Sequence, residues 1–350
     1  MTEKPSIFVI GCGGTISAVP RQKEWRVWKT GELTVHEILK NIPLLSRIAK
    51  VDAMDLFRED SSNIVPENWA TLAQVIFLKL KKADGIVVLH GTDTLHYTAA
   101  AISFLLQELN KPVVFTGSQF ALSQIGSDGR RNVFDSLRVA AEADIAESIV
   151  VFNGKILRGN RTKKFKEIEF DAFGSVGMSA LGRIENSITL SGEQEKRNNK
   201  QPVLTNRFEP NVYLLKLHPG FRPEIIETMI NNGTKGFVFE GFGAGNVPTL
   251  GERAVLPYIK RCVSSNIPVV ISTQCSLGTS WVYLYEVGKK ALDVGGIPGF
   301  DLLSETALVK LMWVLGQTRN MEKIKEMMHQ NYSGEITPEV RTVEQKSLYR

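Results

Sequence analysis

The sequence predicts an α/β protein in which a larger N-terminal domain, built on a mostly parallel, doubly wound sheet, precedes a smaller C-terminal α/β domain. Short apolar segments alternate with helical patterns through about residue 152, as they do in parallel sheets. Polar side chains follow directly after several of these apolar segments. The length of 350 residues also exceeds that of a typical single core, which indicates a second domain.

The strands and helices of the N-terminal half are predicted from the period of their apolar residues. Strands are expected at residues 7–10, 51–57, 85–89, 112–115 and 149–152. Helices are expected at residues 33–45, 66–82 and 128–143, and another follows the third strand and continues to about residue 109. Residues 21–31 show neither period, and we expect a mobile loop that acts as a lid.

A polar, uneven stretch at residues 191–210 separates this pattern from a second one. Beyond it, strands are expected at residues 212–217, 236–239 and 269–272, and helices at 223–231, 252–264 and 305–315. We therefore expect a catalytic N-terminal α/β domain of residues 1–192, a linker of residues 193–210 and a smaller α/β domain of residues 211–350.

Composition limits the class of protein. The 42 basic and 37 acidic residues give a net charge of +5, which by itself is too small to indicate a nucleic-acid partner. Cys12, Cys262 and Cys275 are too few and too widely spaced for a disulfide framework, which favours a reducing compartment. The first apolar segment is too short for a secretory signal, and none is long enough to span a bilayer. We expect a cytoplasmic protein without nucleic-acid or membrane partners.

Several common catalytic motifs are absent from the sequence. The glycine turn at residues 11–16 has Ile16 where a dinucleotide-binding fingerprint needs its last glycine, and no phosphate-binding GK[ST] follows. His36-Glu37 lacks the second histidine of a zinc peptidase, and no GxSxG is present. No His/Cys cluster has metal-ligand spacing, so we expect no metal. His90, at the end of a buried strand, is predicted to be structural.

Hydroxyl and carboxylate side chains follow four of the predicted strands. They are Thr15, Ser61, Thr92 with Asp93, and Ser118. Because the carboxyl ends of parallel strands meet at one edge of a sheet, we expect these side chains to share a cleft. For Thr92, Asp93 and Thr94 considered in isolation, helix capping is the commoner role and remains an alternative.

The residue types at these strand ends limit the chemistry. A threonine hydroxyl is a weak nucleophile that needs a base or a proton-accepting network beside it. A lysine close to a carboxylate can relay a proton from such a hydroxyl, and backbone N–H groups at glycine turns can hold an oxyanion. Acyl transfer through a threonine ester is therefore chemically coherent.

Residues 155–166 carry six basic side chains. An RNA-contacting patch is one interpretation of this segment. A solvated charged face is the commoner outcome, and we expect it here.

Motifs distributed in order along the chain resemble those of the L-asparaginase family. They include Gly13-Gly14-Thr15-Ile16, Asp60-Ser61-Ser62 and His90-Gly91-Thr92-Asp93-Thr94. Residues 157–164, 170–173, 243–248, 273–275 and 334–337 resemble the cytoplasmic, type I branch. A single motif would be weak evidence, but this ordered set covers nearly the whole chain and is highly specific.

The resemblance implies a two-domain asparaginase-like fold and hydrolysis of L-asparagine to L-aspartate and ammonia without a cofactor. It implies that Thr15 is the nucleophile. It also implies a second catalytic group in which Lys164 and Asp93 support Thr92.

The resemblance further implies a substrate site. Asp93 and Ser61, with Asp60 beside them and Thr92 adjoining, would hold the α-amino and α-carboxylate groups of asparagine. Family members assemble as homodimers or homotetramers with sites near subunit contacts. Asn246 is expected to contribute at such a contact.

One departure from the family pattern concerns the loop that follows Thr15. Ten residues after Thr15, where family enzymes place a tyrosine, stands Trp25, and neither Arg26 nor Trp28 replaces that tyrosine. An indole N–H donates but cannot accept a proton. We expect Trp25 to cover the substrate as an apolar lid, and the activity to be low. Cys275 keeps its place and is expected to be a small buried thiol.

Regulation is expected to differ as well. Some type I enzymes bind asparagine at an allosteric site through a Thr and an Arg, and the corresponding positions here hold Lys163 and Glu240. The Glu240 carboxylate would repel the carboxylate of a bound amino acid. We therefore expect no allostery of this kind and a hyperbolic rather than sigmoidal asparagine saturation curve.

Two other functions remain open from the sequence. One is a component of a tRNA-dependent amidotransferase that supplies ammonia to a partner. Members of that class carry an extra N-terminal module, whereas the first strand here is expected from about Ser6, which favours the asparaginase. The other is an amino-acid-binding relative that lost its activity with the loop tyrosine. Hydrolysis of free asparagine, without partner or tRNA, distinguishes the asparaginase from both.

Overall fold

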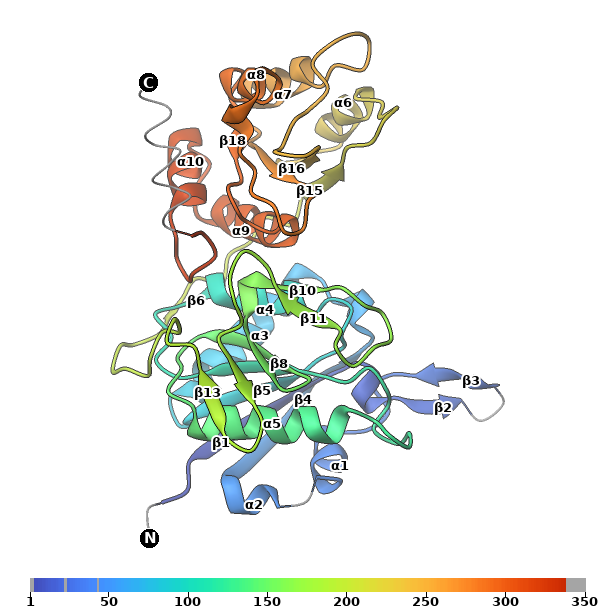
Figure 1. The fold of residues 1–350 in the computed structure, drawn as a ribbon, viewed down its shortest axis with the longest axis vertical. Helices are drawn as coiled ribbons and strands as arrows, with labels where there is room; N and C mark the ends of the chain where they lie inside the picture. The colour runs from blue at the N-terminus through green and yellow to red at the C-terminus, as the bar shows by residue number, and fades with distance from the viewer. Residues whose placement is uncertain (1–2, 22–23, 43, 338–350) are drawn as a thin grey trace. The chain divides into compact units, whose positions relative to one another are not determined.

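The computed structural model describes residues 3–21, 24–42 and 44–337, apart from the side chains of residues 24–27. The chain divides into two units, Met1–Asn206 and Arg207–Arg350. Each unit contains its own sheet (Figure 1). Among the described residues, no helix combines the length and the apolar character needed to cross a membrane.

The main sheet of the N-terminal unit has eight strands in the order β13-β12-β9-β8-β7-β5-β1-β4. Its parallel part consists of β4 (Lys50–Glu59), β1 (Ser6–Gly13), β5 (Gly85–Leu89), β7 (Val113–Thr116) and β8 (Ser148–Phe152). The antiparallel extension consists of β9 (Lys155–Arg158), β12 (Gly182–Ile184) and β13 (Ile188–Leu190). The predicted fold class and the five predicted parallel strands are confirmed.

Helices cover both faces of this sheet (Figure 1). One face carries α3 (Pro66–Leu80) and α4 (Leu95–Leu105), and the other carries α5 (Gly129–Glu142) with the short helices α1 (Val35–Lys40) and α2 (Leu45–Ile48). Val87 and Val114 of the central strands belong to the same buried apolar cluster as Val133 and Leu137 of α5. Every residue of β5, β7 and β8 is buried. Because both faces of the sheet are covered, these strands consist of continuous apolar runs.

The order of the parallel strands locates a crevice. Counted along the chain, the five strands stand in the order second, first, third, fourth, fifth, and the order reverses at β1. In open sheets of this order, ligands bind outside the carboxyl ends of the first and third strands, where the connections diverge to opposite faces. Here those strands are β1 and β5.

Two local predictions are wrong. Residues 21–31 contribute to a hairpin of β2 (Val19–Arg21) and β3 (Glu24–Lys29), which projects from the sheet (Figure 1). A projecting ribbon has no face that must alternate apolar and polar residues, so its sequence shows no period. The single helix expected at residues 33–45 is instead α1 and α2, because Leu44 adopts a φ of 68°, which an α-helix cannot include. Pro43, predicted to end that helix, lies outside the described residues.

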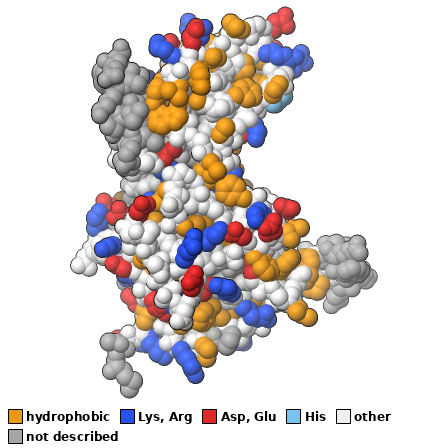
Figure 2. Space-filling model, viewed as in Figure 1, with side chains coloured by type: hydrophobic (Ala, Val, Ile, Leu, Met, Phe, Trp, Pro, Cys, Tyr) orange, Lys and Arg blue, Asp and Glu red, His pale blue; other side chains and the backbone are white. Residues whose placement is uncertain are grey.

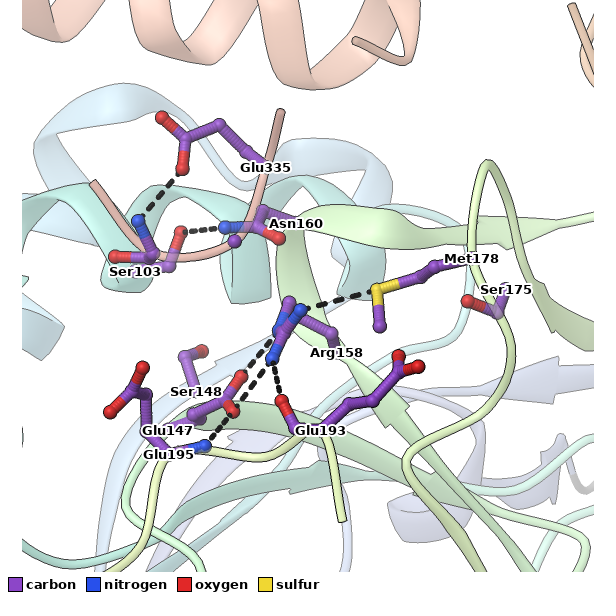
Figure 3. A network of polar contacts seen from close by, with 12 residues as sticks. Ser103, Glu147, Ser148, Arg158, Asn160, Ser175, Met178, Glu193, Glu195 and Glu335 are labelled. Atoms are coloured by element: carbon purple, nitrogen blue, oxygen red, sulfur yellow. Dashed lines mark hydrogen bonds and ion pairs between the residues drawn. The ribbon is translucent and has the colours of Figure 1, made fainter. Parts of the chain in front are cut away.

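The basic segment of residues 155–166 is not a solvated face throughout, and that prediction is wrong for two of its arginines. Arg158 is 9% exposed and Arg161 is 1% exposed. Arg158 donates from Nε and Nη2 to the two carboxylate oxygens of buried Glu147, at 2.6 and 2.9 Å, and from Nη2 to the Glu193 carbonyl at 2.9 Å (Figure 3). Burial opposes the charge of Arg158, but the hydrogen bond and the charge of Glu147 outweigh it, and the pKa of Arg158 is raised.

This buried ion pair predicts a large effect on stability. Glu147→Met leaves an unpaired guanidinium in the interior, and we expect it to lower the free energy of unfolding by about 3–5 kcal/mol in urea titrations. Glu147→Met/Arg158→Met removes both charges and should recover most of that loss. Glu142→Met breaks the exposed pair with Arg138 and should change stability by less than about 1 kcal/mol. A double variant less stable than Glu147→Met would contradict this account.

The polar stretch after residue 191 is bound to the N-terminal unit. The Glu195 N–H donates to Glu147 at 2.6 Å, and Arg197 donates to the carbonyls of Asp84, Ala140 and Ala143 at 2.6–2.8 Å. Farther along, β14 (Val203–Leu204) pairs with β6 (Leu106–Gln107). Hydrogen bonds therefore hold this stretch to the N-terminal unit as far as β14, although its composition is that of a linker.

The C-terminal unit is a smaller α/β sandwich. Its parallel sheet has the order β15 (Val212–Lys216), β16 (Gly236–Gly241), β17 (Val269–Thr273) and β18 (Ile297–Pro298). Its helices are α6 (Glu224–Asn231), α7 (Leu256–Ser264), α8 (Glu286–Asp293), α9 (Ser304–Gln317) and α10 (Met321–His329). A core around Phe237, Phe239, Ile259 and Ile271 lies between the strands and the helices.

The cysteines are separate and unpaired. Cys12 and Cys262 are buried, and burial raises the pKa of Cys262 to about 12. Cys275 is exposed, so the prediction of a buried thiol at this position is wrong. It lies just beyond β17 in a surface turn, where its Cβ has no core to enter.

Charged side chains of both signs are interspersed over the face shown in Figure 2, as the small net charge suggests.

Candidate active site

Glycines bring together the loops that follow β1, β4 and β5. A β-carbon on Gly14 would lie 2.2 Å from the α-carbon of Gly91, and one on Gly91 would lie 2.7 Å from the hydroxyl of Ser61. Gly14 also has a φ of 82°, a conformation that other residues rarely adopt. Thr15 directly follows Gly14 and Thr92 directly follows Gly91, so their loops are in contact at the crevice.

Thr15 presents an open hydroxyl at this edge of the sheet. It begins the 3-10 helix Thr15–Ser17 and is partly exposed. Within the described part of the chain, its side chain makes no hydrogen bond. Ser17 fixes the turn, because its buried hydroxyl donates to the Gly14 carbonyl at 2.7 Å and accepts from the Gly31 N–H at 2.9 Å. Ser17 thus braces the turn that carries the partly exposed Thr15.

Lys164 connects the two polar residues that follow β5. It ends β10 (Thr162–Lys164), which pairs with β11 (Phe173–Ser175) in a separate hairpin. Its ammonium donates to the Thr92 hydroxyl at 2.8 Å and to an Asp93 carboxylate oxygen at 2.7 Å. The Lys164 side chain is 13% exposed, whereas that of Asp93 is 65% exposed. The group thus has a buried end at Thr92 and a solvated end at Asp93.

The alternative in which Thr92, Asp93 and Thr94 only cap α4 is wrong. Thr94 is the N-cap residue, but its side chain makes no capping hydrogen bond. Its hydroxyl donates instead to the Ser61 carbonyl at 2.6 Å. The two residues before it are bonded by Lys164, more than 70 positions later in the chain. Tertiary contacts have replaced the local role that these residue types usually have.

Ser61 and Asp60 lie at the end of β4, beside these residues. Ser61 is 3% exposed and packs against Gly91. The Asp60 carboxylate accepts from the backbone N–H and the hydroxyl of Ser62, at 3.0 and 2.7 Å. These bonds cap the 3-10 helix Ser61–Asn63 and hold the loop in place.

His90 is a fully hydrogen-bonded structural residue, as predicted. Its Nδ1 lies 2.8 Å from the Gly91 carbonyl and its Nε2 lies 3.1 Å from the Thr98 hydroxyl. Because a carbonyl can only accept, Nδ1 carries the proton. Burial lowers the pKa of His90 to about 4, so the ring is neutral near pH 7. It supports the backbone of the Gly91–Thr92 turn.

Sequence reasoning did not identify the groups that shape the exit of β7. The Asp128 carboxylate accepts from the N–H groups of Gln119 and Phe120, at 3.0–3.1 Å. Buried Asn132 donates to the Gly117 carbonyl at 3.0 Å. The sequence did place Asp128 at the start of a predicted helix, where an aspartate usually caps the helix. In the structure its carboxylate makes no capping bond and binds the preceding loop instead.

The remaining candidate residues belong to other strands and loops. Ser118 follows β7 and is fully buried. Lys163 lies in β10 and Glu240 lies in β16 of the C-terminal unit. Asn246 belongs to a turn of that unit, where its backbone pairs with Phe242. Trp25 lies in β3, but its side chain is outside the described residues. Among residues 3–21, 24–42 and 44–337, no group of three or more His, Cys, Asp or Glu side chains is placed to hold a metal.

Two protein-family models match almost the entire length of the chain. The model described as "Asparaginase, N-terminal" matches residues 6–196, and "Glutaminase/Asparaginase C-terminal domain" matches residues 211–328. The chain belongs to the asparaginase family. The family predicted from the motifs is thereby confirmed.

Curated relatives of this asparaginase-family chain carry two different names. It is 36% identical over 348 residues to a component of the glutamyl-tRNA(Gln) amidotransferase of Pyrococcus abyssi, a match that covers 96% of this chain and 78% of that protein. It is 34% identical over 332 residues to L-asparaginase of Thermococcus kodakarensis, covering 95% of this chain and 99% of that protein. Amide hydrolysis is common to the family, but the two names leave the physiological substrate open.

Solved structures of the family share the fold. The thermostable L-asparaginase from Thermococcus kodakarensis matches with a TM-score of 0.87 at 34% identity, covering 95% of this chain and 99% of that one. L-asparaginase I from Vibrio cholerae matches with a TM-score of 0.84 at 30% identity, with the same coverage. The likeness to a type I enzyme agrees with the branch that the motifs predicted.

Proposed function

We propose that this asparaginase-family chain hydrolyses free L-asparagine to L-aspartate and ammonia, with Thr15 as the nucleophile. The observation that carries the proposal is the contact of Lys164 with Thr92 and Asp93, on a loop that touches the Thr15 turn through Gly14 and Gly91. A threonine hydroxyl on a turn that touches the loop of a lysine-bonded hydroxyl fits nucleophilic catalysis, which needs a proton-accepting network near the nucleophile.

In the first step, the Thr15 oxygen attacks the side-chain amide carbon of asparagine. The new C–O bond forms, the C–N bond breaks and an aspartyl ester remains on Thr15. The hydroxyl proton of Thr15 passes to the departing nitrogen, which leaves as ammonia. The group of Thr92, Lys164 and Asp93 handles this proton, and backbone N–H groups at the glycine turns stabilise the oxyanion.

In the second step, water adds to the ester carbon. The ester C–O bond breaks, a proton returns to the Thr15 oxygen and aspartate leaves. The Asp93 carboxylate holds the α-ammonium group of the substrate through a charge-assisted hydrogen bond, and Ser61, with Asp60 beside it, binds the α-carboxylate. We further propose a homodimer or homotetramer with Asn246 at a subunit contact.

A second candidate function is supply of ammonia within a tRNA-dependent amidotransferase. It is favoured by the 36% identity to a protein named as a component of such an enzyme. The site chemistry would be the same in both cases. The difference is whether the chain turns over the free amino acid without another protein.

The test is ammonia release from asparagine and from glutamine by the purified chain, without partner protein or tRNA. We expect multiple turnovers on asparagine, with a hyperbolic saturation curve. Release that starts only when partner proteins and tRNA are added would favour the amidotransferase. Tight asparagine binding by calorimetry with no ammonia would identify an amino-acid-binding relative. A Thr15→Ala preparation, purified in parallel, serves as the blank.

Trp25 provides a separate prediction about the rate. If the missing phenol limits proton handling, Trp25→Tyr should raise kcat for asparagine, on the order of tenfold. Trp28→Tyr, in the same strand, is the matched control and should leave kcat unchanged. An unchanged rate in Trp25→Tyr would show that the indole does not limit catalysis.

A further inference from the structure

The hairpin that carries Lys164 is a weak structural element. Its strands β10 and β11 pair over three residues each and form a two-stranded sheet separate from the main one. Ribbons of this size have little stability of their own. Residues 167–170 at the tip are exposed to solvent. Because Lys164 ends β10, a shift of this hairpin would move its ammonium away from Thr92.

The base of the hairpin is anchored by apolar packing and an ion pair. Phe173 is 2% exposed and its ring meets that of Phe152 in β8 edge-on, with 4.9 Å between the centroids. Lys155 in β9 pairs with Asp171. These contacts fix β11, and the Phe165 N–H donates to the Ala172 carbonyl at 2.8 Å, so it is the tip beyond Phe165 that other groups must hold.

The Gln119 side chain is hydrogen-bonded to the backbone of the hairpin tip. Its side-chain nitrogen lies 2.9 Å from the Glu167 carbonyl and 3.2 Å from the Glu169 carbonyl, with that of Lys166 at 3.5 Å. Carbonyl oxygens can only accept, so the amide nitrogen must face them. The next residue, Phe120, meets Phe170 edge-on at 5.4 Å.

Gln119 itself is firmly placed. Its backbone N–H donates to the Asp128 carboxylate at the start of α5. Two positions earlier, a β-carbon on Gly117 would lie 2.3 Å from the His90 carbonyl and 3.6 Å from the methyl carbon of Thr92. The segment Gly117–Phe120 therefore contacts the Thr92 loop at one end and the hairpin tip at the other.

We propose that Gln119 is a positioning residue that holds the β10–β11 hairpin so that the Lys164 ammonium stays within hydrogen-bond distance of Thr92 and Asp93. We call this hold of Gln119 on the hairpin tip the clamp. Its kinetic consequence rests on the proposed function, but the clamp itself can be tested without that function. Gln119 acts through Lys164 and has no assigned contact with substrate.

The test compares Gln119→Met with Gln124→Met. Methionine keeps the length of glutamine but has no N–H donor. Gln124 lies in the same loop and its side chain bonds within that loop, accepting from the Ala121 N–H at 2.9 Å, which makes it the matched control. Gln119→Lys restores donors that can reach the same carbonyls and serves as the rescue variant.

Two measurements are made on each variant. One is kcat and KM for asparagine, and the other is amide hydrogen exchange of the peptide spanning residues 162–175. In Gln119→Met we expect kcat to fall about 10–100-fold, KM to stay within about twofold and exchange in the hairpin to become faster. Gln124→Met should match the wild type in both measurements, and Gln119→Lys should recover most of kcat.

The outcomes separate the clamp from the proposed function. Faster hairpin exchange in a protein that never releases ammonia from asparagine would support the clamp and overturn the proposed function. Unchanged exchange in Gln119→Met would overturn the clamp, whatever the activity. Faster exchange with unchanged kcat would show that the hairpin does not need to be held for Lys164 to act, and would overturn the positioning role.

Discussion

Replacing Thr15 by alanine is expected to abolish asparagine hydrolysis, with kcat falling on the order of 10⁴-fold or more. The loss is this large because the other hydroxyl of this turn, that of Ser17, is buried and bonded to the backbone of Gly14 and Gly31. Stability should change little, within about 0.5 kcal/mol, because the side chain is partly exposed and makes no hydrogen bond among the described residues. Ammonia release and urea unfolding of the same preparation measure the two effects.

Thr15→Ser is the matched control for this variant. It keeps the nucleophilic oxygen and removes only a methyl group, so we expect kcat within about tenfold of the wild type. Trapping the acyl-enzyme and locating the added mass on the peptide that contains Thr15 would provide direct evidence. Substantial turnover by Thr15→Ala would refute threonine-ester catalysis at this position.

The second large effect is expected from Lys164→Met, which should lower kcat by about 10²–10⁴-fold. The ammonium is bonded to both Thr92 and Asp93, so its removal breaks the proposed proton relay and leaves Asp93 without its cation. Lys163→Met, one position earlier in the same strand, removes an equal charge from the other side of the ribbon and should retain near-wild-type kcat.

Lys164→Arg distinguishes a relay from a fixed charge. Arginine keeps the positive charge but cannot give up a proton at accessible pH. If Lys164 relays a proton, kcat of Lys164→Arg should be nearly as low as that of Lys164→Met. An arginine variant with kcat close to the wild type would show that the residue acts only through its charge.

The sequence predicted the parts of this protein that depend on local pattern. The apolar runs of β1, β5, β7 and β8 are long and uniform because both faces of the sheet are covered, and each was located to within a few residues. The polar residues after these strands were also recognisable. The family of the chain was recognised from the ordered set of motifs, because no single motif would have been specific enough.

The sequence was least informative where a segment has no buried face of its own. The hairpin β2–β3 looked like a loop because nothing forces its residues to alternate. Helix α8 was not predicted, because it has only eight residues and buries only Gly288 and Ala291. Arg158 looked solvent-exposed because its partner, Glu147, precedes a different strand and becomes its neighbour only when β8 and β9 pair.

The sequence by itself therefore determined the fold class, the family and the candidate residues Thr15, Ser61, Thr92, Asp93 and Lys164. Only the tertiary structure decided which of these touch, because Lys164 is more than 70 positions from Thr92 and reaches it through a separate hairpin. The tertiary structure also decided that the Thr94 hydroxyl donates to the Ser61 carbonyl instead of capping α4. The physical reason is that a hydroxyl, amide or ammonium takes whichever acceptor the folded chain places within about 3 Å, and sequence distance carries no information about that choice.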